Sequence, residues 1–138
     1  MLNEKEFPFL AEKGHTVSLV GGGGKTTLLY AMAAHCARKG WRVLVTTTTH
    51  IRQPAVCYAP DDAALATLWQ AGQYAVIGTP AENGKLTLPP QQLLHRMAQA
   101  DAVFIEADGA KHYPCKLPAA HEPVLLPQSD IVLAVAGL

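Results

Sequence analysis

A run of four glycines is followed by a lysine and two threonines, between an apolar segment and the predicted start of a helix. Glycine lets backbone N–H groups turn toward a bound anion, and the amino end of a helix adds a partial positive charge at the same place. Lys25 adds a full charge, and the Thr26 hydroxyl can bind a magnesium ion that bridges two phosphates. The run therefore predicts a phosphate-binding site made of Gly21, Gly22, Gly23, Gly24, Lys25, Thr26 and Thr27.

The spacing of this loop differs from the standard P-loop pattern G-x-x-x-x-G-K-[ST], in which the first glycine precedes the second by five residues. Five residues before Gly24 stands Leu19, within the predicted strand, so the loop is shorter than usual. The alternative is a glycine-rich turn that only lets a helix pack closely on a sheet. That alternative does not explain a lysine and two threonines at the start of the helix.

Two acidic residues follow the apolar segment 102–105, namely Glu106 and Asp108. Nucleotide hydrolases use an acid at the end of a buried strand to hold magnesium and to orient water. Because side chains alternate along a strand, both carboxylates point the same way if the strand continues through Ala107. We expect Asp108 to bind the metal together with Thr26, and Glu106 to orient the water. The alternative is that Asp108 only begins a turn.

The candidate catalytic residues are therefore Lys25, Glu106 and Asp108, with Lys25 stabilising the charge that develops on the phosphate. Four threonines and a histidine (46–50) follow another apolar segment, 43–45. Threonine suits an extended strand, so a strand extension explains one or two of them. We expect Thr47 and Thr48 to bind the terminal phosphate or the water around magnesium.

The proline-rich segment 111–127 contains His112, Cys115 and His121, which could bind zinc if the segment folded around the ion. Their spacings do not match the C-x-x-C or H-x-x-x-H patterns of zinc ligands. We therefore expect ordinary loop residues there.

Apolar segments and amphipathic segments alternate along the chain. Strands are predicted over 16–20, 43–45, 74–77, 102–105 and 131–136, and helices over 26–39, from Asp61 or Asp62, and from Pro90. Asn83-Gly84 predicts the turn of a hairpin. Continuous apolar strands between helices favour an α/β fold, a P-loop-like three-layer domain with a mainly parallel sheet. With 138 residues, 49% of them hydrophobic, residues 1–138 suffice for a single domain.

The charge and the apolar pattern exclude several classes of partner. Eleven basic and eleven acidic residues give a net charge of zero, with no basic run to bind nucleic acid or an anionic membrane. No apolar run approaches 18 residues, and no charged leader precedes an apolar stretch. Three cysteines do not suggest a disulfide framework. We expect a cytoplasmic protein.

Several short motifs occur in one order along the chain: Val20-Gly21-Gly22-Gly23-Gly24-Lys25-Thr26-Thr27, Val43-Leu44-Val45-Thr46-Thr47-Thr48-Thr49, Glu106-Ala107-Asp108-Gly109-Ala110, Lys116-Leu117-Pro118 and His121-Glu122-Pro123. In this order they resemble the YqeC-like family, whose members are regarded as accessory proteins of selenium-dependent molybdenum hydroxylases. Each motif alone is weak, but their joint order is specific. The resemblance implies that a molybdenum hydroxylase or its cofactor is the partner.

The resemblance also implies roles for single residues. Lys25 and Thr26 carry over as phosphate and magnesium residues, Glu106 and Asp108 as the acidic strand end, and Lys116, His121 and Glu122 as a signature loop that we include among the cofactor-binding candidates. The family pattern continues past Leu138, so we expect a chain shortened at its carboxyl end. The last strand would then leave apolar surface that a second copy could cover, giving a homo-oligomer.

The motifs predict magnesium-dependent binding of a nucleoside triphosphate and its slow hydrolysis. The resemblance implies that this activity belongs to an accessory or maturation factor for a selenium-dependent molybdenum hydroxylase. ATP is the better candidate than GTP, since the chain has no Asn-Lys-x-Asp run. Two alternatives stay open. One is an ATP-dependent ligase of the Mur type, for which this length scarcely leaves room. The other is a non-catalytic module that binds a phosphorylated cofactor such as a molybdopterin nucleotide.

Overall fold

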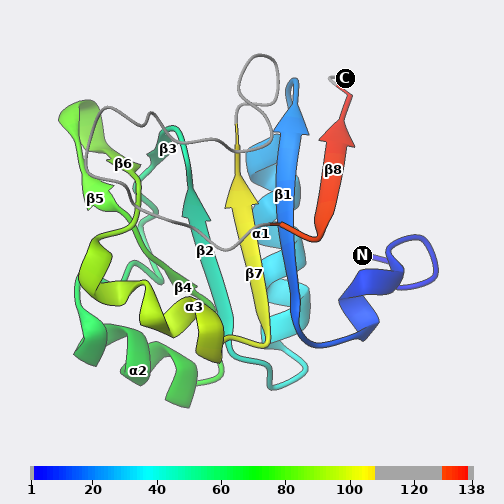
Figure 1. Cartoon of the computed structure of the whole chain (residues 1–138), viewed down its shortest axis with the longest axis horizontal. Coiled ribbons are helices and arrows are strands. Elements are labelled where there is room, and N and C mark those ends of the chain that lie inside the picture. Colours follow the sequence, from blue (N-terminus) through cyan, green and yellow to red (C-terminus); the bar gives the residue numbers. More distant parts are fainter. Residues whose placement is uncertain (1, 108–128, 137–138) are drawn as a thin grey trace.

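The main sheet has five strands in the order β4-β2-β7-β1-β8, and every neighbouring pair in it runs parallel (Figure 1). This is a computed structural model, and it describes residues 2–107 and 129–136. The strands are β1 (His15–Gly21), β2 (Val43–Thr47), β4 (Ala75–Val76), β7 (Ala102–Glu106) and β8 (Ile131–Val135).

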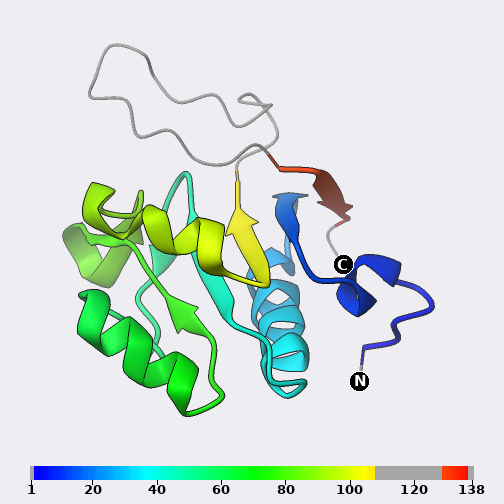
Figure 2. The same ribbon diagram turned by 60° about the horizontal axis from the view of Figure 1, so that its bottom comes forward.

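Helices cover both faces of this sheet. Figure 2 shows α1 (Lys25–Ala37) on one side of the strands, and α2 (Asp62–Gln70) with α3 (His95–Gln99) on the other. Every residue of β2 and β7 is buried, as expected of parallel strands that are covered on both faces. The prediction of an α/β fold with a mainly parallel sheet flanked by helices is thereby confirmed.

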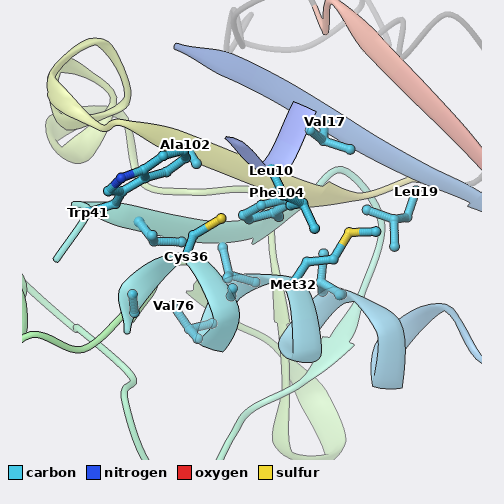
Figure 3. Close-up of a cluster of buried hydrophobic side chains, with 14 of the residues drawn as sticks. Leu10, Val17, Leu19, Met32, Cys36, Trp41, Val76, Ala102 and Phe104 are labelled. Atoms are coloured by element: carbon cyan, nitrogen blue, oxygen red, sulfur yellow. The ribbon is translucent and has the colours of Figure 1, made fainter. Parts of the chain in front are cut away.

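The alternating side chains of β7 divide the core into two clusters. Phe104 points toward Met32 and Cys36 of α1, within the larger cluster (Figure 3). Val103 and Ile105 belong to the second cluster, which α2 and α3 supply with apolar side chains. Glu106, two residues after Phe104, therefore points to the face that α1 covers.

The pairing register aligns the carboxyl ends of three central strands. Glu106 of β7 lies beside Leu19 of β1 and beside Thr47 of β2. On the other side of β1, Gly21 pairs with Val135 of β8. The residues that end β1, β2 and β7 consequently share one edge of the sheet, which is the edge where ligands bind in open α/β sheets.

Several predicted boundaries change in detail. The helix predicted from Asp61 or Asp62 is capped by Asp61, whose carboxylate accepts a hydrogen bond from the Ala64 N–H at 2.9 Å. The helix predicted from Pro90 is two short pieces, η3 (Gln91–Leu93) and α3. At the amino end, η1 (Pro8–Ala11) was not predicted, because its one fully buried side chain, Leu10, leaves no periodic pattern.

The predicted hairpin is present and belongs to a second sheet. Asn83 and Gly84 both have positive φ angles, 62° and 68°, which asparagine and glycine adopt most easily. They lie in η2 (Glu82–Gly84), which joins β5 (Thr79–Pro80) to β6 (Lys85–Thr87). β6 also pairs with β3 (Ile51–Arg52), giving a small antiparallel sheet in the order β3-β6-β5. A two-residue strand such as β3 carries no sequence pattern of its own.

β8 forms one end of the main sheet, and its Val132 side chain is 63% exposed. Self-association through this surface stays a prediction. Among the described residues, no helix combines the length and the apolar character needed to cross a membrane.

The amino ends of β1 and β8 are linked through His15. Its Nε2 lies 3.0 Å from a carboxylate oxygen of Glu12, and its Nδ1 hydrogen-bonds the carboxylate of Asp130. Asp130 also accepts a hydrogen bond from the Thr16 N–H at 2.6 Å. The hydrogen bonds to Glu12 and Asp130 raise the pKa of His15 above its ordinary value of 6.5.

We predict that this link makes stability depend on pH. A raised histidine pKa means that the folded state binds the proton more tightly than the unfolded state. The stabilisation is complete below pH 6.5 and is lost as the pH rises through the raised pKa of His15. Urea unfolding at a series of pH values should show this loss, and His15→Gln should flatten it. His50→Gln changes an exposed histidine and should leave the pH dependence of stability as it is in the wild type. The same pH dependence in all three proteins would contradict the link.

Candidate functional site

The strand order places a topological switch point between β1 and β7. After β1 the chain continues through α1 to β2, which lies beyond β7, whereas the strand after β7 in the described part of the chain, β8, lies on the far side of β1. The chain thus leaves two adjacent strands in opposite directions, as Figure 1 shows. Ligands of open α/β sheets bind in the crevice that such a reversal opens. The glycine loop follows β1, and Glu106 ends β7.

The first two glycines of the loop pack against β8. Gly21 has a φ of 115°, and a Cβ atom there would lie 2.3 Å from the carbonyl oxygen of Val135. That carbonyl accepts a hydrogen bond from the Gly22 N–H at 2.9 Å. Close contact with β8 therefore explains the glycine at position 21 without a ligand. It does not explain the rest of the loop, where a Cβ on Gly23 would meet nothing within 4 Å.

The second half of the loop and the start of α1 present open backbone donors. Gly24 caps α1 in the left-handed conformation, with a φ of 93°. Within residues 2–107 and 129–136, none of the N–H groups of residues 23–27 donates a hydrogen bond to another described residue. Gly23 and Gly24 are exposed. This cluster of donors at a helix amino end is suited to an anion.

Lys25 is the first residue of α1 and reaches the end of β7. Its Nζ donates a hydrogen bond to the carbonyl oxygen of Ala107 at 3.2 Å. In the part of the chain that the structure describes, no carboxylate forms an ion pair with Lys25. The ammonium group therefore lies beside the open amides, with a neutral carbonyl as its protein partner.

Thr26 and Glu106 are in direct contact. The Thr26 hydroxyl donates a hydrogen bond to Glu106 Oε1 at 2.8 Å, and the Glu106 side chain is nearly buried. The structure thus brings together three of the predicted site residues, Lys25, Thr26 and Glu106. Asp108, Lys116, His121 and Glu122, together with His112 and Cys115, lie outside the described residues.

The threonine run contacts backbone carbonyl groups. The Thr46 hydroxyl donates to Ile77 O at 2.8 Å, and the Thr47 hydroxyl donates to Glu106 O at 2.9 Å; both side chains are completely buried. The Thr48 N–H also donates to Glu106 O, at 3.1 Å. Thr47 was expected to contact phosphate or magnesium water, but its hydroxyl contacts the strand that carries Glu106. Sequence patterns could not reveal this, because the partner lies 59 residues away.

Tyr30 lies near Glu106, whereas His50 lies apart from the site. Burial, with a smaller effect of Tyr74 and Glu106, raises the pKa of Tyr30 to about 12, so this tyrosine on α1 is neutral at physiological pH. His50, after the threonine run, lines a separate hollow of about 370 Å³ together with Ala81, Glu82, Asn83 and Lys85 of the hairpin. Among the described residues, no three His, Cys, Asp or Glu side chains gather as a metal site would require.

Comparison with known proteins identifies the family. The family model described as "YqeC protein" matches residues 17–138. The chain belongs to the YqeC family. A relative described as "Uncharacterized protein YqeC", from Escherichia coli (strain K12), is 38% identical over 137 residues. The alignment covers 92% of this chain and 54% of that relative, so the chain spans about half the relative's length.

The YqeC match includes the glycine loop, the threonine run and Glu106. The predicted resemblance to this family is therefore confirmed. No solved structure matches the chain.

We predict that substitutions at two glycines of this YqeC-family loop affect the free energy of unfolding very differently. Gly21→Ala should lower the free energy of unfolding by roughly 2–4 kcal/mol, since the new methyl group overlaps Val135 and an L side chain is strained at this φ. Gly23→Ala is the matched control and should change it by less than about 0.5 kcal/mol. Urea denaturation of both variants measures the difference. Similar values for both would mean that the loop does not depend on β8.

Proposed function

We propose that this YqeC-family chain binds a nucleoside triphosphate with magnesium, ATP being the nucleotide, and hydrolyses it slowly. The observation that carries the proposal is the hydrogen bond from Thr26 to Glu106, 2.8 Å long, beside the open amides of the loop. A hydroxyl at a helix start and a carboxylate at the end of the neighbouring strand are the protein groups that hold magnesium in P-loop nucleotide hydrolases.

The phosphates would bind at the second half of the loop. The N–H groups of residues 23–27 and the amino end of α1 supply donors and partial positive charge. Lys25 adds a full charge, and its present partner, the Ala107 carbonyl, is neutral. Exchanging that carbonyl for a phosphate oxygen would give the ammonium group a partner of opposite charge.

Magnesium fits the donor set formed by Thr26 and Glu106. The ion prefers six oxygen ligands and keeps several waters, so one hydroxyl and one carboxylate suffice when phosphate oxygens complete the set. Bound there, magnesium would neutralise charge on the phosphates. We therefore propose Glu106 as the carboxylate that faces the metal, the role that the sequence suggested for Asp108.

We propose that hydrolysis is slow because of the contact that Glu106 makes. Among the described residues, Glu106 is the carboxylate that the end of β7 brings to Thr26. A carboxylate that faces the metal and hydrogen-bonds Thr26 is poorly placed to orient the attacking water as well. Lys25 and the amides would still stabilise charge in the transition state, so we expect turnover that is slow but measurable.

We further propose that the site serves the maturation of a selenium-dependent molybdenum hydroxylase, a role that the resemblance to the YqeC family implies. The partner would be the hydroxylase or its cofactor. Copurification of the tagged wild-type chain with the hydroxylase in the presence of ATP would support this role, provided that the tagged Lys25→Ala variant does not copurify with it.

We predict that Lys25→Ala weakens ATP binding by about 2–4 kcal/mol, or roughly 30- to 1,000-fold in Kd, because a direct charge pair with phosphate is lost. The fold should persist, since the side chain is only half-buried. Isothermal titration with MgATP measures Kd, and circular dichroism monitors the fold. Lys13→Ala, at an exposed lysine before β1, is the control and should leave Kd unchanged.

Unchanged affinity in folded Lys25→Ala would contradict the phosphate site. Phosphate release then separates the possible reactions of the wild-type chain. Release from ATP alone supports the hydrolase, and release only after addition of an acid or amine supports the ligase. Tight binding without any release supports the non-catalytic module.

We predict that Thr26→Val and Glu106→Gln weaken ATP binding in magnesium far more than in EDTA. Both changes remove an oxygen that the metal would contact, and neither removes a phosphate donor. Thr67→Val removes a hydroxyl from α2, on the opposite face, and should affect neither condition. Titrations with and without magnesium decide the matter. Equal losses in both conditions would mean that Thr26 and Glu106 only support the fold.

A further inference from the structure

We infer that Thr47 is a positioning residue, whose buried hydroxyl holds the main chain of Glu106 so that the carboxylate reaches Thr26 and the metal. This inference rests on the proposed function. It assigns Thr47 a role that acts through Glu106 and needs no contact with nucleotide or metal.

The hydrogen bonds of Thr47 fix the direction in which its hydroxyl proton points. Its Oγ1 accepts a hydrogen bond from the Thr49 N–H at 2.9 Å and lies 2.9 Å from Glu106 O. A carbonyl oxygen can only accept, so the single proton of the Thr47 hydroxyl must point to Glu106. The Thr49 hydroxyl, 3.2 Å from the Thr47 hydroxyl, then acts as the donor in that contact. Because Thr47 is completely buried, water cannot replace these partners.

The peptide group between Glu106 and Ala107 is held from both neighbouring strands. Its carbonyl accepts from the hydroxyl of Thr47, the last residue of β2, and from the N–H of Thr48, the next residue, which fills both lone pairs. Its N–H donates to Leu19 O of β1 at 2.9 Å. With this peptide plane fixed, the Glu106 side chain leaves the backbone in one direction, toward α1 and Thr26.

Such a fixed backbone matters for a metal ligand. Sites are effective when the residues that support them hold each ligand within a few tenths of an ångström of its working position. β7 ends at Glu106, where regular pairing stops. Without the Thr47 hydroxyl, the Thr48 N–H alone would connect this carbonyl to β2. The carboxylate would then sample more orientations, and magnesium would bind more weakly.

Thr46 provides a matched control on the same strand. It is as completely buried as Thr47, and its hydroxyl donates to a backbone carbonyl at nearly the same distance, 2.8 Å. Its partner is Ile77, after β4, and its side chain points to the opposite face of the sheet. Thr46→Val removes the hydrogen bond to Ile77, whereas Thr47→Val removes the bond to Glu106 together with the two that Thr49 donates to Thr47 Oγ1. Only Thr47→Val therefore loosens Glu106.

The test compares Thr47→Val, Thr47→Ser and Thr46→Val by the magnesium concentration that gives half-maximal binding of ATP. Thr47→Val should raise this concentration about tenfold, a change typical of one lost hydrogen bond, while ATP affinity in EDTA changes less than about twofold. Thr47→Ser keeps the hydroxyl and should lie near wild type. Thr46→Val also loses a buried hydrogen bond and should lower the unfolding temperature, without raising the magnesium requirement.

Two results would overturn the inference while the proposed function stands: an unchanged magnesium requirement in Thr47→Val, or an equal increase in Thr46→Val. A wild-type chain that binds no nucleotide would instead overturn the proposed function, and the inference with it.

Amide hydrogen exchange in the wild-type chain gives a second reading if Thr47→Val does not fold. MgATP, compared with ATP in EDTA, should slow exchange of the Thr48 and Thr49 N–H groups, which donate to Glu106 O and to the Thr47 hydroxyl. The Ile77 N–H, which donates to Val45 O, should exchange at the same rate in both conditions. Binding of MgATP without slower exchange at Thr48 and Thr49 would overturn the inference.

Discussion

The end of β7 must hold a nearly buried carboxylate, Glu106, in one orientation. A carboxylate withdrawn from water costs several kcal/mol unless hydrogen bonds or a cation compensate it. Three neighbouring elements provide this compensation or fix the backbone around it: α1 through Thr26, β2 through Thr47 and β1 through Leu19. A magnesium ion would complete the compensation, which links the stability of this strand end to the proposed binding of MgATP.

The sheet order makes this arrangement possible. β7 lies between β1 and β2, so one strand end is within reach of both the glycine loop and the threonine run. On the other side of β1, Gly21 and Gly22 contact Val135 of β8. The first half of this short loop contacts β8. The second half of the loop is therefore the part that is open to a ligand. The remaining donors of the loop come from Gly23, Gly24 and the first turn of α1.

Sequence patterns predicted what depends on local chemistry. Buried parallel strands are continuous apolar runs, Asp61 caps a helix, and Asn83 adopts the positive φ of a turn, so these features could be found without a structure. Contacts across the sheet could not. Whether the Thr47 hydroxyl meets a ligand or the main chain depends on the register between β2 and β7, which no residue of the run specifies. The contact between Glu106 and Thr26, on which the proposed metal site rests, joins residues that are likewise far apart in the sequence.

The central claim is that the loop, Lys25, Thr26 and Glu106 form one site for a nucleotide and its metal. The most direct measurement is a crystal structure with ATP and manganese, because the anomalous scattering of manganese identifies the position of the metal. We predict manganese bound between the Thr26 hydroxyl and the Glu106 carboxylate, with phosphate oxygens against the amides of residues 23–27. A metal bound away from both side chains, or phosphates bound elsewhere while these amides contact only water, would contradict the claim.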